Sequence, residues 1–320
     1  MHAVDNKHRT SLSGEALALI YMGIIAFSAQ KTGFSLLLFP ELAALSHDVF
    51  TRPQGKWAGQ PWQLVITPTI AALFGLFVVR HTNFNAIAIT LIVSVSLIVI
   101  KLLKSTIAPA ISAGVLPMVL SERSWIYPVG IFVGLSVLVL VLLIWKRCAP
   151  KAPSLSHEEE IDSKVIDDLE TPPHDRFWSV ALVAFVLVLG TLAQVTGLFF
   201  LIFPPLIVVA YEILGHPEIP GWMERPILFP VISFLTASVG LVFCHVFDAG
   251  FVGVIVAMFC SIAILKIFKV HMPPALAVGI LPFVMKAPNY RYPISVLIGT
   301  VALMLYFASY RRLRESTWLK

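Results

Sequence analysis

One stretch of this sequence occurs twice at a fixed distance. Residues 101–119, KLLKSTIAPAISAGVLPMV, return 165 residues later as 266–284, KIFKVHMPPALAVGILPFV. Two lysines, two prolines, and Ala, Gly, Leu and Val positions match without a gap. A self-similarity of this length and period indicates an internal duplication, so the fold has to be built from two copies of one unit.

The match extends beyond this motif in both directions. Downstream the spacing stays at 165, and upstream it is 164. The pairs are Tyr127-Pro128 with Tyr292-Pro293, Gly134 with Gly299, Lys146-Arg147 with Arg311-Arg312, Thr32-Gly33 with Thr196-Gly197, and Phe39-Pro40 with Phe203-Pro204.

Composition indicates that lipid surrounds the chain. Hydrophobic residues make up 58% of the 320 residues and charged residues only 13%, whereas soluble domains carry about a quarter charged residues. The apolar runs are long enough to cross a bilayer as helices and do not alternate as barrel strands do. Cys148, Cys244 and Cys260 are too scattered for a disulfide framework or a zinc site, and no cofactor is predicted.

The predicted fold is therefore an all-α polytopic membrane protein with two parallel four-span repeats. Short apolar segments carrying Pro40 and Pro204-Pro205 suit broken or re-entrant half-helices rather than full crossings. The predicted spans are 15–30, 64–79, 86–100 and 127–145 in the first repeat, and 178–194, 228–246, 251–265 and 294–310 in the second. The predicted domains are an N-terminal tail (1–14), membrane repeat 1 (15–147), a linker (148–176), membrane repeat 2 (177–312) and a C-terminal tail (313–320).

Charge predicts the orientation. An even number of crossings returns each half to its starting side, and both halves close on basic clusters, which places both termini in the cytoplasm. We expect a bacterial inner membrane. The linker carries eight acids and three bases between residues 151 and 176, although the whole chain has a net charge of +5. We expect it to be cytoplasmic and solvated, with a short amphipathic helix through Ile161, Val165, Ile166 and Leu169. The excess of bases therefore belongs to membrane-flanking loops, and nucleic acid is not an expected partner.

The repeated motif has the parts of an anion site. Lys101 and Lys104 lie on one face of a helix that is too short to cross the bilayer alone. Proline is favoured at the first position of a helix, so Pro109 and Pro274 predict half-helices whose positive ends point toward the lysines. The alternative is that the lysines snorkel at the membrane boundary and the prolines only pack. The predicted substrate-binding residues are Lys101, Lys104, Pro109, Gly114, Lys266, Lys269, His271, Pro274 and Gly279.

Other polar residues leave further hypotheses open. Glu41 lies in a broken apolar segment and is a candidate gate or proton site, although its counterpart is Pro205. His245, Asp248 and His271 are the candidates in the second half for an intramembrane enzyme acting on a lipid or prenyl substrate. An assembly or sensor protein acting through the acidic linker is a third hypothesis. Tryptophans near span ends favour an interfacial belt: Trp57, Trp62, Trp125, Trp178 and Trp222.

At this motif the chain resembles the HPP family of integral membrane proteins, named for a His-Pro-Pro tract that follows a transmembrane helix. Here the tract reads His271-Met272-Pro273-Pro274-Ala275, with a Met between the His and the prolines, and the first repeat keeps only Pro109-Ala110. The resemblance implies a four-span unit present twice. Some members are implicated in nitrite transport across plastid membranes, which implies a small anionic substrate.

Together these observations predict a transporter or channel for a small anion, not an enzyme, with its site at the interface of the two repeats. The lipid bilayer and the anion are the expected partners, and a homo-oligomer is left open.

Overall fold

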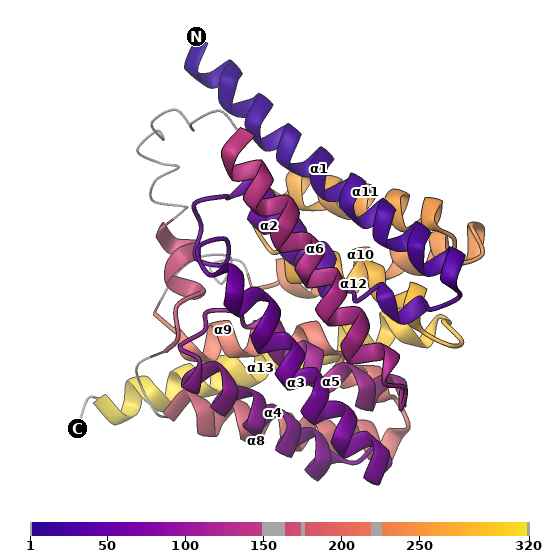
Figure 1. Cartoon of the computed structure of the whole chain (residues 1–320). Coiled ribbons are helices and arrows are strands. Elements are labelled where there is room, and N and C mark those ends of the chain that lie inside the picture. Colours follow the sequence, from indigo (N-terminus) through magenta and orange to yellow (C-terminus); the bar gives the residue numbers. More distant parts are fainter. Residues whose placement is uncertain (1, 149–163, 174–176, 219–225, 319–320) are drawn as a thin grey trace.

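The computed structural model describes residues 2–148, 164–173, 177–218 and 226–318. Within these residues the protein is helical and contains no strand (Figure 1). Seven helices are long and apolar enough to span a membrane. The predicted all-α polytopic membrane fold is therefore confirmed.

Eight long helices occupy the places of the eight predicted spans. Seven meet the length for a crossing, and α4, with 17 residues, is slightly shorter than the rest. Helix α1 also continues toward the N-terminus through residues predicted as a tail. The long helices are α1 (His2–Thr32), α3 (Pro61–His81), α4 (Ala86–Leu102), α6 (Ile126–Cys148), α8 (Phe177–Thr196), α10 (Leu228–Val246), α11 (Phe251–Phe268) and α13 (Arg291–Trp318).

Four short helices lie between the long ones, at the predicted breaks. They are α2 (Glu41–Thr51), α5 (Pro109–Leu120), α9 (Pro204–Gly215) and α12 (Pro274–Ile280), with 3-10 turns η1 (Ser35–Leu37), η2 (Phe199–Ile202) and η4 (Leu281–Val284). Proline stands at or just before the first turn of each short helix, where its missing N–H costs nothing. Pro117 does not stop α5, which continues to Leu120, whereas its counterpart Pro282 lies in η4.

The short helices form the centre of the protein. Residues 41–50, 109–119, 204–214 and 274–280 are all buried. Across the two halves, α5 packs against α9 and α12 packs against α2, and within the second half α12 also packs against α9. Each of the eight long helices contacts at least one short helix. The long helices therefore enclose the broken elements, and their outward faces carry exposed apolar side chains such as Ile87, Val195 and Leu305.

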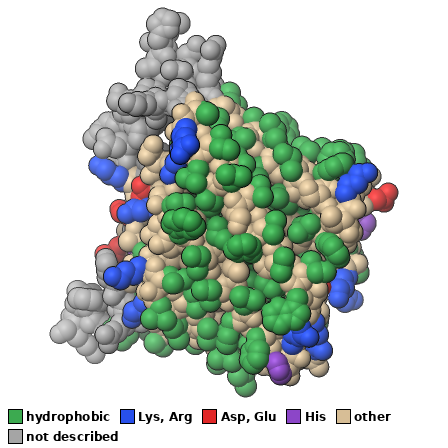
Figure 2. All heavy atoms as spheres, viewed as in Figure 1, with side chains coloured by type: hydrophobic (Ala, Val, Ile, Leu, Met, Phe, Trp, Pro, Cys, Tyr) green, Lys and Arg blue, Asp and Glu red, His purple; other side chains and the backbone are tan. Residues whose placement is uncertain are grey.

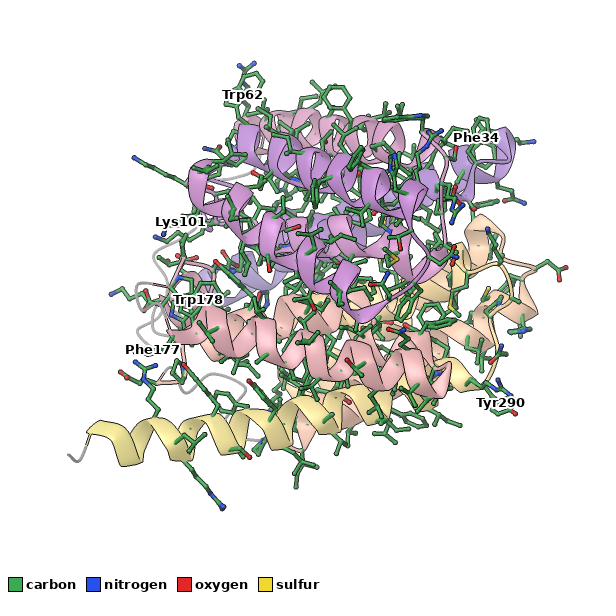
Figure 3. The ribbon with its side chains drawn as sticks, turned by 90° about the horizontal axis from the view of Figure 1, so that it is seen from below. Phe34, Trp62, Lys101, Phe177, Trp178 and Tyr290 are labelled. Carbon is green, nitrogen blue, oxygen red and sulfur yellow. The ribbon has the colours of Figure 1, made fainter. Side chains whose placement is uncertain are left out.

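The molecule has two polar ends separated by an apolar surface. Figure 3 shows Trp62, Lys101, Phe177 and Trp178 at one end, which we call the linker-side end. Phe34 and Tyr290 lie at the opposite end, called the far end. Between them the visible surface is mostly hydrophobic, with Lys and Arg gathered toward its edges (Figure 2). This distribution is typical of a protein whose middle faces lipid.

Equivalent residues make equivalent contacts in the two halves. The hydroxyl of Tyr127 donates to the Ala113 carbonyl, and that of Tyr292 donates to the Val278 carbonyl, each at 2.6 Å. Each pair of partners is related by the spacing of 165. The elements also follow the same order in each half. How the halves are oriented relative to each other stays a prediction.

Two glycine pairs set the distance between a long and a short helix. A Cβ added to Gly75 would lie 2.0 Å from the Gly114 carbonyl oxygen, and one added to Gly240 would lie 1.9 Å from that of Gly279. A backbone carbonyl cannot move aside as a flexible side chain can, so these contacts exclude any residue larger than glycine at positions 75 and 240. Two of the predicted site residues, Gly114 and Gly279, thus hold α5 and α12 against α3 and α10.

We expect Gly240→Ala to destabilise the fold strongly, because overpacking against backbone costs about 1–3 kcal/mol or more. Gly134→Ala is the matched control, since its Cβ would meet the flexible tip of Leu42 at 2.9 Å. Thermal unfolding in detergent, followed by size-exclusion chromatography, should show the larger loss for Gly240→Ala. Equal losses would contradict this account of the helix contact.

Candidate functional site

The four predicted lysines lie at the linker-side turns that follow α4 and α11. All four are exposed. Lys104 and Lys269 adopt left-handed backbone conformations, with φ of 48° and 54°, and these turns end the two helices. Lys266 forms an ion pair with Glu15 of α1. The side chains thus surround the entrances to α5 and α12 rather than the centre of the bundle.

The other predicted residues lie deeper. Pro109 and Pro274 begin α5 and α12 and are buried, as are Gly114 and Gly279 one turn further along. The half-helices themselves are therefore in the core, while the cationic side chains before them reach the surface. Sequence reasoning had grouped both sets into a single site.

Trp57 joins the loop after α2 to the repeated motif. Its indole N–H donates to the Thr106 carbonyl at 3.0 Å, and the Gln60 side-chain oxygen accepts from the Thr106 amide at 2.9 Å. Trp57 is buried, so the prediction that it belongs to an interfacial belt was wrong. Trp62 and Trp125 are exposed near span ends, Trp178 is buried, and Trp222 lies outside the described residues.

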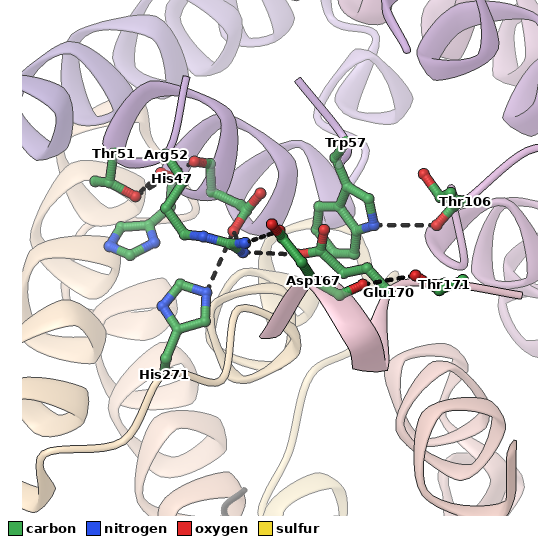
Figure 4. Close-up of polar contacts among 10 residues, drawn as sticks. His47, Thr51, Arg52, Trp57, Thr106, Asp167, Glu170, Thr171 and His271 are labelled. Atoms are coloured by element: carbon green, nitrogen blue, oxygen red, sulfur yellow. Dashed lines mark hydrogen bonds and ion pairs between the residues drawn. The ribbon is translucent and has the colours of Figure 1, made fainter. Parts of the chain in front are cut away.

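A partly buried ionic cluster lies at the linker-side end of α2 (Figure 4). Arg52 donates to Asp48 at 3.0 Å, to Glu170 at 2.8 Å and to Asp167. His271, which precedes α12, contacts the same Asp48 oxygen at 3.2 Å. We call these five residues the Arg52 cluster. It ties together the first repeat, the second repeat and the linker, and it includes one predicted site residue, His271.

Electrostatics keep Arg52 charged in this setting. Burial alone would lower its pKa, but Asp48, Glu170 and Asp167 raise the pKa above its ordinary value. Burial, together with the nearby Asp48 carboxylate, raises the pKa of Glu170, against the opposing effect of Arg52. Burial therefore favours the neutral form of Glu170, while Arg52 favours the ionised form.

The described part of the linker packs onto the bundle instead of lying free in solvent. Residues 164–169 are helical, and Leu169 and Glu170 are buried. The His216 ring at the end of α9 contacts the Thr171 carbonyl at 2.7 Å, and Gly215 packs against Pro173. The expectation of a solvated linker was wrong for this segment, while Ile161 of the predicted amphipathic helix lies outside the described residues.

Glu41 is a buried acid among the short helices. It is 2% exposed, begins α2 and accepts a hydrogen bond from the Ser112 hydroxyl of α5. The Tyr127 and Tyr292 hydroxyls lie within its electrostatic reach, one from each half. Its second oxygen, Oε2, is buried without a hydrogen-bond partner.

The residues considered for an intramembrane enzyme do not come together. His245 and Asp248 are exposed and precede α11, whereas His271 follows it. The 18 residues of α11 separate them by about 27 Å at the rise of an α-helix. Within the described residues no group of three His, Cys, Asp or Glu side chains could hold a metal ion.

Asp48, Arg52, Asp167 and Glu170 were missed by sequence reasoning, which assigned them to polar loops and a solvated linker. A signal was present, because Asp48 and Glu212 are related by the upstream spacing of 164 and both lie near the C-terminal ends of buried helices. Both carboxylates are buried in the structure. An acid kept at the end of each apolar segment could have been recognised as part of the repeated unit.

Comparison with known proteins supports one assignment. The model of the HPP transmembrane region matches residues 6–154, which include the first membrane repeat and its repeated motif. Neither the curated proteins nor the solved structures contain a match. With this match and seven apolar helices long enough to span a membrane among the described residues, the chain is an integral multi-pass membrane protein whose residues 6–154 are similar to the HPP transmembrane region.

Proposed function

We propose that the protein moves a small anion, with nitrite as the representative substrate, across the membrane between the two halves. The observation that carries the proposal is the central set of short helices, enclosed by long ones and containing buried polar side chains. Broken helices inside a membrane protein are tolerated where they line a substrate path or are covered by protein. The implied nitrite transport of some HPP family members agrees with this choice.

The linker-side lysines serve as the collecting region of this path. Lys101, Lys104, Lys266 and Lys269 surround the segments that lead into α5 and α12, and exposed cations raise the local concentration of an anion. The N-terminal end of α5, which begins at Pro109, adds a positive helix end on the same route. The anion is therefore attracted at the surface before it meets the buried interior.

The Arg52 cluster acts as the gate at this end. Its contacts hold α2, the segment before α12 and the linker together, so the linker-side route is closed in this conformation. A buried charged network of this kind is sensitive to the loss of one partner. Release of residues 164–173 would free the ends of α2 and α9.

The orientation follows from the distribution of bases. In the part of the chain that the structure describes, Lys and Arg residues gather at the linker-side end, where α4, α6, α11 and α13 end. Cytoplasmic ends of membrane helices are enriched in these residues. We therefore assign the linker-side end, with both chain termini, to the cytoplasm of a bacterial inner-membrane protein.

In liposomes containing the purified protein, nitrite should enter faster than in protein-free liposomes. Replacing Lys104 and Lys269 by Ala should reduce the initial rate severalfold, because the anion loses its collecting charges. The matched control replaces two other exposed linker-side bases, Lys56 and Arg147, by Ala. Equal rates for both double variants would remove the motif lysines from the mechanism.

Asp167→Asn combined with Glu170→Gln should raise the uptake rate severalfold, because it leaves Arg52 paired with Asp48 but detaches the linker. Asp168→Asn is the control, since Asp168 is an exposed acid on the same linker helix. Uptake in liposomes and protease sensitivity of the linker should change together. If protease shows that the linker of the double variant is released but its nitrite uptake rate is unchanged, the gate is ruled out.

A further inference from the structure

Glu41 has an environment unlike that of Asp48 and Glu170. Asp48 and Glu170 share Arg52, whereas Glu41 receives one hydrogen bond, from Ser112, and its Oε2 atom has no hydrogen-bond partner among the described residues. Burying a carboxylate with so little compensation is costly, so the neutral, protonated acid is the stable form at rest.

Among the side chains that the structure describes around Glu41, no cation forms an ion pair or hydrogen bond with its carboxyl group. From α6 and α13 come the hydroxyls of Tyr127 and Tyr292, and each already donates its hydrogen to a backbone carbonyl. Helix α12, which packs against α2, carries no titratable side chain. On α1, Tyr21 donates to the Gly134 carbonyl and Glu15 pairs with Lys266. Asp48 and His47 are the other titratable groups on α2 itself.

A route for protons leads from Glu41 to the linker-side end. Asp48 lies seven residues along α2, which is two helical turns and therefore the same face, about 10 Å away along the axis. Asp48 contacts His271, whose ring is partly exposed. A titratable group thus stands at the centre, another at the end of α2, and a third where solvent reaches.

We infer that Glu41 is the coupling site of the transporter and carries one proton with each anion. The inference rests on the proposed anion transport and names its coupling ion. The proton leaves water at one membrane face, binds the Glu41 carboxylate and is released to water at the other face. No covalent bond to the substrate forms or breaks. Because the positive and negative charges move together, this transport is electrically neutral.

The counterpart of Glu41 in the second repeat is Pro205, so the site has one carboxyl rather than two. Glu41 nevertheless interacts electrostatically with a tyrosine from each half. A single proton site near both repeats gives one coupling stoichiometry for the whole chain. It also makes the two repeats functionally unequal although their folds share the same order of elements.

The test uses the full chain in liposomes with nitrite as the probe and an inward acid gradient. The wild-type protein should accumulate nitrite against its concentration gradient, after subtraction of uptake by protein-free liposomes. Glu41→Gln should still equilibrate nitrite but lose the accumulation, because the amide cannot release a proton. Accumulation by Glu41→Gln equal to that of the wild type would overturn the inference. Glu212→Gln, which alters another buried acid on α9, is the control and should retain accumulation.

A second measurement does not depend on anion flux. Infrared spectra of the purified protein in lipid nanodiscs at neutral pH should contain the carbonyl band of a protonated carboxylic acid that Glu41→Gln removes. Ser112→Ala should shift this band, because the Ser112 hydroxyl no longer donates to Glu41. A spectrum unchanged by Glu41→Gln would show an ionised Glu41 and contradict the inference. If Glu41→Gln removes the carboxylic acid band but neither the wild type nor any variant mediates nitrite uptake, the anion proposal fails while the proton site stands.

Discussion

Backbone amides and carbonyls cannot be left unpaired in hydrocarbon, where each costs several kcal/mol, and this constraint organises the whole molecule. The chain departs from regular helix between α4 and α5 and between α11 and α12. Such segments survive because long helices surround them and because side chains from neighbouring loops bond to them. Gln60 accepts the Thr106 amide hydrogen, and Trp57 donates to the carbonyl of the same residue. The broken centre and the complete outer helices therefore depend on each other.

Charge is distributed in the same ordered way. The cationic motif lysines stay at the linker-side surface, Arg52 neutralises several carboxylates just inside it, and Glu41 remains without a cation nearer the centre. Each step inward leaves fewer opposite charges to compensate a buried acid. In the proposed mechanism an anion is collected at the linker-side surface, admitted when the Arg52 cluster separates, and moved together with a proton held at Glu41.

The sequence predicted the elements better than the contacts between them. Hydrophobic runs, prolines and the duplication predicted the long helices and the breaks at Pro109 and Pro274, because those features act within a few residues. The Arg52 cluster could not be predicted, since Arg52 and Glu170 are 118 residues apart and meet only when the linker packs against α2. The lysines were expected near a membrane boundary or at the mouth of a cavity, and the structure places them exposed at the helix ends. Glu41 was recognised as a candidate, but its contact with Ser112 required the fold.

The most direct test of the account is whether the substrate path passes beside the short helices. Cys148, Cys244 and Cys260 are first replaced, and Ser112→Cys on α5 is compared with Ile98→Cys, whose exposed side chain lies on the apolar surface of α4. In the variant that carries Asp167→Asn and Glu170→Gln, a small, charged thiol reagent should modify Ser112→Cys. Nitrite should slow that reaction, and Ile98→Cys should stay unmodified. A Ser112→Cys protein that transports nitrite while its thiol never reacts, with or without linker release, would place the path elsewhere.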